Sequence, residues 1–182
     1  MTSVSNIHIN GTYTDPAVRA STAIREEADR LLLTYQAKAA LVTELRLDGA
    51  LRQQTYASLV DFTLDHVRPY LAATDRVLYA TAAGAAGTRL LVRALRRLRE
   101  SLSRHIDELI GASTSDQVAQ AALALGVGLA ACLDIERTVL LPALAELPGA
   151  DLPGLATDLR TVLDGGDLSQ ADRPRLATAH HV

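Results

Sequence analysis

An uninterrupted helical pattern runs through residues 89–110, RLLVRALRRLRESLSRHIDELI. Its large apolar residues recur after four, three, four, four and three positions, at Leu91, Leu95, Leu98, Leu102, Ile106 and Leu109. This spacing places them on one side of an α-helix, so we expect that side to pack against other helices. Gly84, Gly87 and Gly111 mark the two ends of the pattern.

Weaker helical patterns lie on either side of this segment. Ser21 or Thr22 is expected to cap a first helix, and Pro69 is expected to kink or split a second. Long helices joined by short connections predict an all-α fold, specifically an antiparallel up-down four-helix bundle. The further helices are expected over about 21–47, 51–83, 113–147 and, as a short amphipathic segment, 155–163.

The composition fits a single folded domain. The chain has 182 residues, 48% of them hydrophobic, a formal charge of −3 and a single cysteine, Cys132. These values exclude a disordered chain and a disulfide scaffold. We expect an irregular arm over residues 1–19, the bundle over 20–147, and a short helix with a polar tail over 148–182.

The sequence also gives expectations about location and partners. The N-terminal residues show no basic segment followed by an apolar one, and no apolar run reaches the roughly 18 residues of a membrane helix. We therefore expect a cytoplasmic protein without a membrane partner. No aromatic residue lies between the arginines of residues 89–104. Acidic residues do lie near them. We expect them to form a solvated surface and the protein not to bind nucleic acid; anion or nucleic-acid binding by these arginines is the less favoured alternative.

The informative residues are polar ones on otherwise apolar helix faces. Cys132 and Glu136 are four residues apart, and so are His66, Tyr70 and Thr74 in succession. If the helices fold back at the predicted breaks, Tyr70, Thr74, Cys132 and Glu136 share one layer of the bundle. Such layers of inward polar residues are how helical bundles build metal and ligand sites.

Each of these residues also has a purely structural interpretation. Glu136 could form an ion pair with an arginine such as Arg93 or Arg96, or be only partly buried, since an unpaired buried carboxylate is costly. Cys132 could be a small core residue, and Tyr70 a core aromatic whose hydroxyl finds a partner.

Three other polar residues are expected near this layer. Tyr35 and Gln36 of the first helix are expected to approach it, although a core position is the alternative for Tyr35. His66 is expected to come close to His105, as a structural pair in preference to a metal site.

Two segments resemble the hemerythrin-like (HHE cation-binding) family. RPYLAATDRVLYATA, residues 68–82, is similar to that family's second helix, where Pro-His precedes Glu-Glu and then an apolar-apolar-Tyr-Pro run. CLDIERTVLLPALAEL, residues 132–147, is similar to its fourth helix, His-x-x-x-Glu followed by an apolar run into Pro. The resemblance covers about residues 20–147 and implies a four-helix bundle with a di-iron centre.

The metal ligands are where this sequence departs from the family. Only Glu136 matches the ligand pattern. The family's ligand positions otherwise carry Tyr35 or Gln36, Tyr70, Thr74, Val92 and Cys132. A di-iron centre needs several imidazoles and bridging carboxylates, so we expect no metal site and no cofactor. Weak binding of one iron by Tyr70 and Glu136 is the alternative.

Three functional hypotheses follow. In the first, the vacated bundle interior binds a small molecule, and Glu136 and Tyr70 perform metal-independent acid–base chemistry. The second is a non-catalytic interaction module that self-associates, for example as a homodimer. The third is residual iron binding with the oxygen, peroxide or nitric-oxide chemistry that the resemblance implies. The expected pocket lining of the first hypothesis is Tyr35, Gln36, His66, Thr74, Val92 and Cys132.

Overall fold

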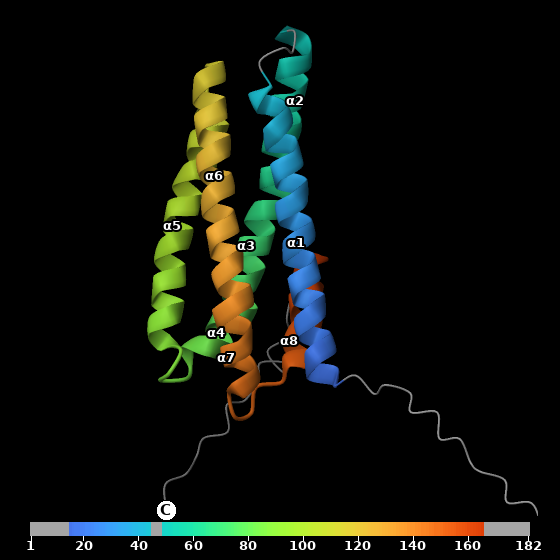
Figure 1. Ribbon diagram of the computed structural model, residues 1–182, viewed down its shortest axis with the longest axis vertical. Coiled ribbons are helices and arrows are strands. Elements are labelled where there is room, and N and C mark those ends of the chain that lie inside the picture. The colour runs from blue at the N-terminus through green and yellow to red at the C-terminus, as the bar shows by residue number, and fades with distance from the viewer. Residues whose placement is uncertain (1–14, 45–48, 166–182) are drawn as a thin grey trace, which may run out of the picture.

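The protein is a bundle of helices (Figure 1). The computed structural model describes residues 15–44 and 49–165, and within these ranges every regular element is helical, which confirms the all-α prediction. Four long helical segments lie side by side, and a short helix lies against the lower part of the first. The segments are α1 (Pro16–Thr43), residues 49–83, α5 (Arg89–Gly111), residues 115–146 and α8 (Leu152–Leu163).

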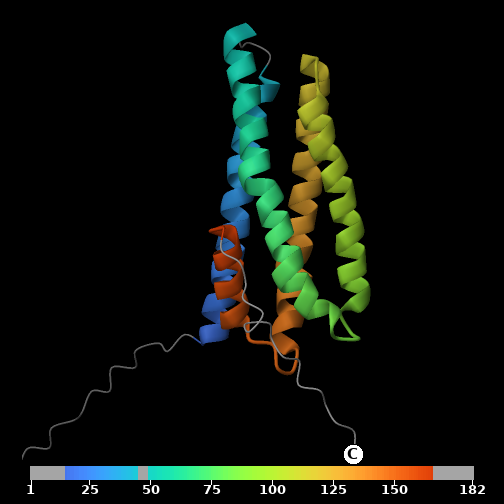
Figure 2. The ribbon, with the colours of Figure 1, turned by 180° about the vertical axis from the view of Figure 1, so that it is seen from behind.

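The second segment stays helical through Pro69. It comprises α2 (Gly49–Phe62), the π-helical turn η1 (Thr63–Val67), α3 (Arg68–Thr74), the π-helical turn η2 (Asp75–Tyr79) and α4 (Ala80–Ala83). A proline lacks the N–H for the helical bond and its ring presses on the carbonyl four residues back. The wider turn just before Pro69 accommodates this clash, so the helix bends without a break (Figure 2).

The fourth segment repeats this arrangement. It comprises α6 (Ser115–Ile135), the π-helical turn η3 (Glu136–Leu140) and α7 (Leu141–Glu146), with Pro142 in the first turn of α7. Glu136 is therefore the first residue of a π turn, a distortion that is frequent at functional sites.

Most predicted helix ends are confirmed, but the start of α1 is not. The predicted cap at Ser21 or Thr22 is wrong, because the Asp15 side chain caps the helix by accepting a 2.9 Å hydrogen bond from the Ala17 amide. Pro16 follows in the first turn, where a proline is well tolerated. At the other end α1 stops at Thr43, short of its predicted end near residue 47, because Glu44 already has an extended backbone; residues 45–47 lie outside the described residues.

The later segments agree more closely with prediction. Thr114 caps α6 through a reciprocal capping box with Gln117. The short C-terminal helix packs against α1 and α3 and buries Leu152, Leu155 and Leu159. A short helix is predicted over 155–163. The observed helix ends at the predicted residue and begins three residues earlier.

The buried side of α5 differs from the predicted one. It consists of Val92, Leu95, Arg99, Leu102, Ile106 and Leu109, whereas Leu91 and Leu98 lie at the edge. The spacing is a regular alternation of three and four, the coiled-coil type of seam, and Arg99 occupies one of its positions. Gly128 of α6 allows close packing here, since a Cβ at that position would lie 2.8 Å from Leu102 Cδ2.

The helix Ser115–Glu146 is also long and apolar enough to cross a membrane, with a mean hydropathy of 1.9 over its most apolar window. Only 39% of that window is buried inside the bundle. The core helix of a soluble protein meets the same criterion, so length and composition alone assign no location.

Candidate functional site

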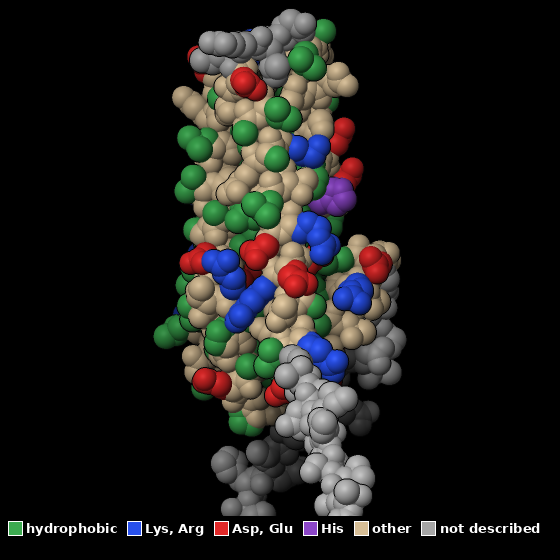
Figure 3. Space-filling view, turned by 45° about the vertical axis from the view of Figure 1, so that its right-hand side comes forward, with side chains coloured by type: hydrophobic (Ala, Val, Ile, Leu, Met, Phe, Trp, Pro, Cys, Tyr) green, Lys and Arg blue, Asp and Glu red, His purple; other side chains and the backbone are tan. Residues whose placement is uncertain are grey.

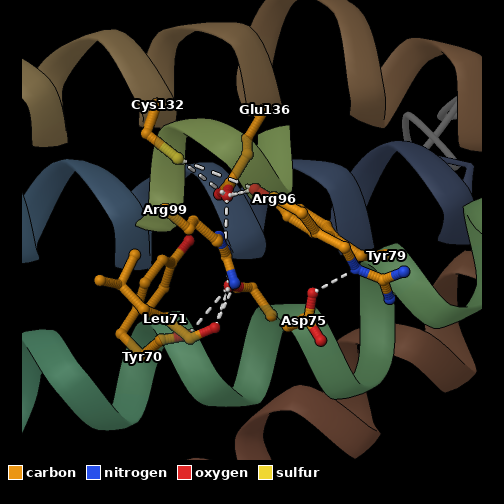
Figure 4. Close-up of polar contacts among 9 residues, drawn as sticks. Tyr70, Leu71, Asp75, Tyr79, Arg96, Arg99, Cys132 and Glu136 are labelled. Carbon is orange, nitrogen blue, oxygen red and sulfur yellow. Dashed lines mark hydrogen bonds and ion pairs between the residues drawn. The ribbon is translucent and has the colours of Figure 1, made fainter. Parts of the chain in front are cut away.

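A buried ion pair links α5 to η3. Arg99 Nη2 donates a 2.8 Å hydrogen bond to Glu136 Oε1, and the two side chains are 10% and 4% exposed. Figure 4 shows the guanidinium of Arg99 between the helix that carries Tyr70 and the one that carries Glu136. Either charge alone would be strongly unfavourable at this depth, so each makes the other's burial possible.

Arg99 also binds the second helical segment. Nη1 donates to the Leu71 carbonyl and Nη2 to the Thr74 hydroxyl, which in turn donates to the Tyr70 carbonyl at 3.0 Å. The guanidinium faces the Tyr79 ring, with Cζ 4.0 Å from the ring centroid. A single side chain thus connects α5, α3, η2 and η3.

The two carboxylate oxygens of Glu136 differ in their contacts, since Oε1 has several polar neighbours and Oε2 has no hydrogen-bond partner among the described residues. Oε1 accepts from Arg99 and from the Tyr79 hydroxyl, and Cys132 Sγ lies 3.7 Å from it. Three buried polar atoms of this cluster lack a hydrogen-bond partner among the described residues, namely Glu136 Oε2, Tyr70 Oη and Arg99 Nε. Each such atom costs about 1–3 kcal/mol, so stability alone does not explain the cluster.

The environment fixes the protonation of the cluster. Burial, and next the charge of Glu136, raise the pKa of Tyr70 and of Tyr79, so both phenols stay neutral, and the Tyr79 hydroxyl donates to Glu136. The same two causes raise the pKa of the Cys132 thiol to about 11. Burial opposes the charge of Arg99, but the negative charge of Glu136 outweighs it and raises the pKa of Arg99.

The predicted layer is brought together in part. Thr74 and Glu136 both bind Arg99, and Cys132 lies beside Glu136. Tyr70 joins through its carbonyl, and Figure 4 shows its ring next to the cluster. The predicted ion pair exists with a different partner, since Glu136 pairs with Arg99.

The two arginines proposed as partners of Glu136 lie elsewhere. Arg96 is exposed and binds Asp75, with 2.9 Å between Nε and Oδ1. Arg93 is also exposed. Both therefore belong to the outer side of α5, and their assignment to Glu136 is wrong.

The remaining predicted residues lie away from the ion pair. Tyr35 is buried, but its hydroxyl donates to the Ala122 carbonyl at 2.9 Å. Ala122 precedes Cys132 by ten residues, about 15 Å along a helix. Gln36 is exposed, and Val92 is buried seven residues, about 10 Å, before Arg99.

The two histidines are engaged with their own neighbours. His66 is exposed and its ring stacks on Phe62 with 4.9 Å between centroids. His105 Nδ1 lies 2.8 Å from Glu108 Oε2. His66 is thus not part of the cluster around Arg99.

Sequence reasoning missed Arg99 and Tyr79. Arg99 was assigned to the solvated arginines of its helix, although its position between Leu95 and Leu102 in the three-four alternation marks it as inward. Tyr79 is hidden by the π turn η2, which shifts the register so that Val77, Leu78 and Tyr79 are all buried in succession. A 3.6-residue period does not predict three consecutive buried residues.

The residues around Glu136 do not fit the di-iron centre that the resemblance implies. Arg99 places a permanent positive charge in contact with the one carboxylate that matches the family pattern. A metal cation there would be repelled by the guanidinium and would have to displace it. Within residues 15–44 and 49–165, no three His, Cys, Asp or Glu side chains are placed to share a metal ion.

A groove runs beside the ion pair, between the helix of α3 and η2 and helix α5. Its volume is about 430 Å³. Its apolar wall is Leu71, Ala72 and Ile106, and the buried Arg99 also lines it. The polar lining residues are Arg68, Asp75, Arg96, Glu100 and Ser103. None of the residues predicted to form an interior pocket lines this groove.

Comparison with protein-family models, with curated proteins and with solved structures finds no match to this chain.

Proposed function

We propose that this protein is a metal-free bundle of the hemerythrin-like, antiparallel four-helix type that binds a small molecule. In this proposal the guanidinium of Arg99 supplies the positive charge beside Glu136 that a metal would otherwise supply. The similarity of residues 68–82 and 132–147 to the family's second and fourth helices supports the fold type. The meeting of Thr74, Cys132 and Glu136 around Arg99 supports the alignment of those two helices.

The groove between α3 and α5 is the observation that carries the binding proposal. It combines an apolar wall with charged and polar side chains that would orient a bound ligand. Arg99 also lines it, and the positive charge of its guanidinium favours a ligand that carries a hydrogen-bond acceptor.

The geometry favours binding over turnover. Tyr70 stays protonated, and neither Tyr70 nor Glu136 lines the groove, so neither side chain is placed to exchange a proton with a ligand bound there. We therefore propose a structural role for the Arg99–Glu136 ion pair in place of the predicted acid–base roles of Glu136 and Tyr70. The proposed ligand site is the groove and not the bundle interior.

Filling the groove tests this proposal. Ala72 and Ala80 are both exposed on the same continuous helix, but only Ala72 lines the groove. A compound from a small-molecule library that raises the melting temperature of the wild type should fail to do so with Ala72→Phe and should still do so with Ala80→Phe. Equal responses of the two variants, or no stabilising compound, would contradict the proposal.

Self-association is a second candidate, supported by exposed apolar residues. Leu123 and Val127 are one turn apart on α6 and are 66% and 63% exposed, and Leu33 of α1 is 66% exposed. Figure 3 shows hydrophobic side chains over the upper left of one face, where charged side chains are sparse. Where such residues form a contiguous apolar patch, the patch is typical of surfaces that bind another protein.

A further inference from the structure

Four exposed arginines lie on the first half of α5. They are Arg89, Arg93, Arg96 and Arg97, spaced so that they point to one side of the helix. Together with Ala83, Val92 and Glu100 they line a second hollow of about 450 Å³. This hollow shares Arg96 and Glu100 with the groove described above, so the two adjoin.

The positive charge of this hollow is only partly compensated. Arg96 pairs with Asp75 at 2.9 Å and Arg97 pairs with Glu100 at 2.7 Å. Arg89 and Arg93 have neither a hydrogen-bond nor an ion-pair partner among residues 15–44 and 49–165. The hollow therefore holds two free guanidinium groups.

The positions of Arg89 and Arg93 in α5 are electrostatically unfavourable for positive charges. Arg89 and Arg93 are four residues apart, a spacing at which like charges repel. Arg89 is the first residue of α5, and the first turn contains no acidic residue. Because the helix dipole is positive at this end, cations there are unfavourable and an anion beside them is favourable. Residues that break a local stability rule in this way are typical of functional sites.

We infer that the hollow binds the phosphate or diphosphate group of a small molecule. A guanidinium presents paired donors that match phosphate oxygens, and two free ones a single turn apart can act on the same group. Val92 and Ala83 supply an apolar wall, which suits an organic phosphate. The inference does not depend on what the adjoining groove binds.

Calorimetry with pyrophosphate at constant ionic strength tests this inference. Arg89→Gln/Arg93→Gln removes the two free cations. The control Arg19→Gln/Arg104→Gln removes the same net charge from two exposed residues outside the hollow. We expect saturable binding by the wild type, a loss of at least about tenfold in affinity for the first double variant, and less than about twofold for the control.

Other outcomes would overturn the inference. It fails if pyrophosphate binds the wild type no more tightly than chloride does at the same ionic strength. It also fails if both double variants lose the same affinity for pyrophosphate. It also fails if a DNA duplex binds more tightly than pyrophosphate and responds to Arg89→Gln/Arg93→Gln in the same way. Ala72→Phe should leave pyrophosphate affinity unchanged, so failure of the groove and failure of this site can be told apart.

Discussion

Replacement of Arg99 by Met should destabilise the protein severely. The variant keeps most of the side-chain volume but leaves Glu136 4% exposed without its cation. Breaking a buried ion pair on one side costs about 3–5 kcal/mol in the free energy of unfolding. For a domain of this size that loss lowers the melting temperature by roughly 6–20 °C.

The double variant Arg99→Met/Glu136→Leu should recover much of this loss. Apolar residues in place of both charges remove the burial cost, and the remaining penalty is the Tyr79 hydroxyl, which loses its acceptor at about 1–3 kcal/mol. Glu136→Leu alone should be as damaging as Arg99→Met, because it leaves a buried guanidinium unpaired. Both single variants should therefore be less stable than the double one.

Urea unfolding followed by circular dichroism measures these differences. Arg96→Met is the matched control, since the Arg96–Asp75 pair has exposed side chains and should contribute less than about 1 kcal/mol. If the Arg99→Met and Glu136→Leu effects add up in the double variant, or if each is as small as that of Arg96→Met, the ion pair does not hold these helices together.

Two further results are expected. Between about pH 9 and pH 11 the free energy of unfolding should fall, because the unfolded chain releases the Cys132 proton near its ordinary pKa of 9.0 while burial and Glu136 raise that pKa to about 11 in the folded state. Urea titrations of Cys132→Ala across this range should show a smaller fall, and an identical fall would mean that the thiol is not shielded. If α6 mediates self-association, sedimentation velocity at increasing concentration should show a species larger than the monomer that Leu123→Glu abolishes. A wild type that stays monomeric throughout would rule this out.

Local signals in the sequence predict the helices well. The alternation of apolar residues defines α5, and the Thr114–Gln117 capping box marks the start of α6, because both depend only on residues near in the chain. The start of α1 was misplaced because Asp15-Pro16 was assigned to the preceding arm, although that dipeptide supplies both a cap and a favourable first residue.

The site was harder to predict because it depends on features that periodicity does not contain. The predicted breaks between the helices place Glu136 and Thr74 at one level, and both side chains do bind Arg99. The choice of Arg99 over Arg93 and Arg96 depends on the rotation of α5, which only its full buried stripe reveals. Tyr79 lies at the end of the π-helical turn η2 and donates to Glu136. The spacing of apolar residues in the sequence does not predict where a π turn adds a residue to a helix.

The iron content and visible spectrum of protein expressed with added iron test most directly whether Arg99 takes the place of a metal in this bundle. With a guanidinium in contact with Glu136, we expect iron clearly below two per chain and no bands of an oxo-bridged di-iron centre. Two irons per chain together with those bands would contradict the Arg99–Glu136 ion pair and the metal-free proposal built on it.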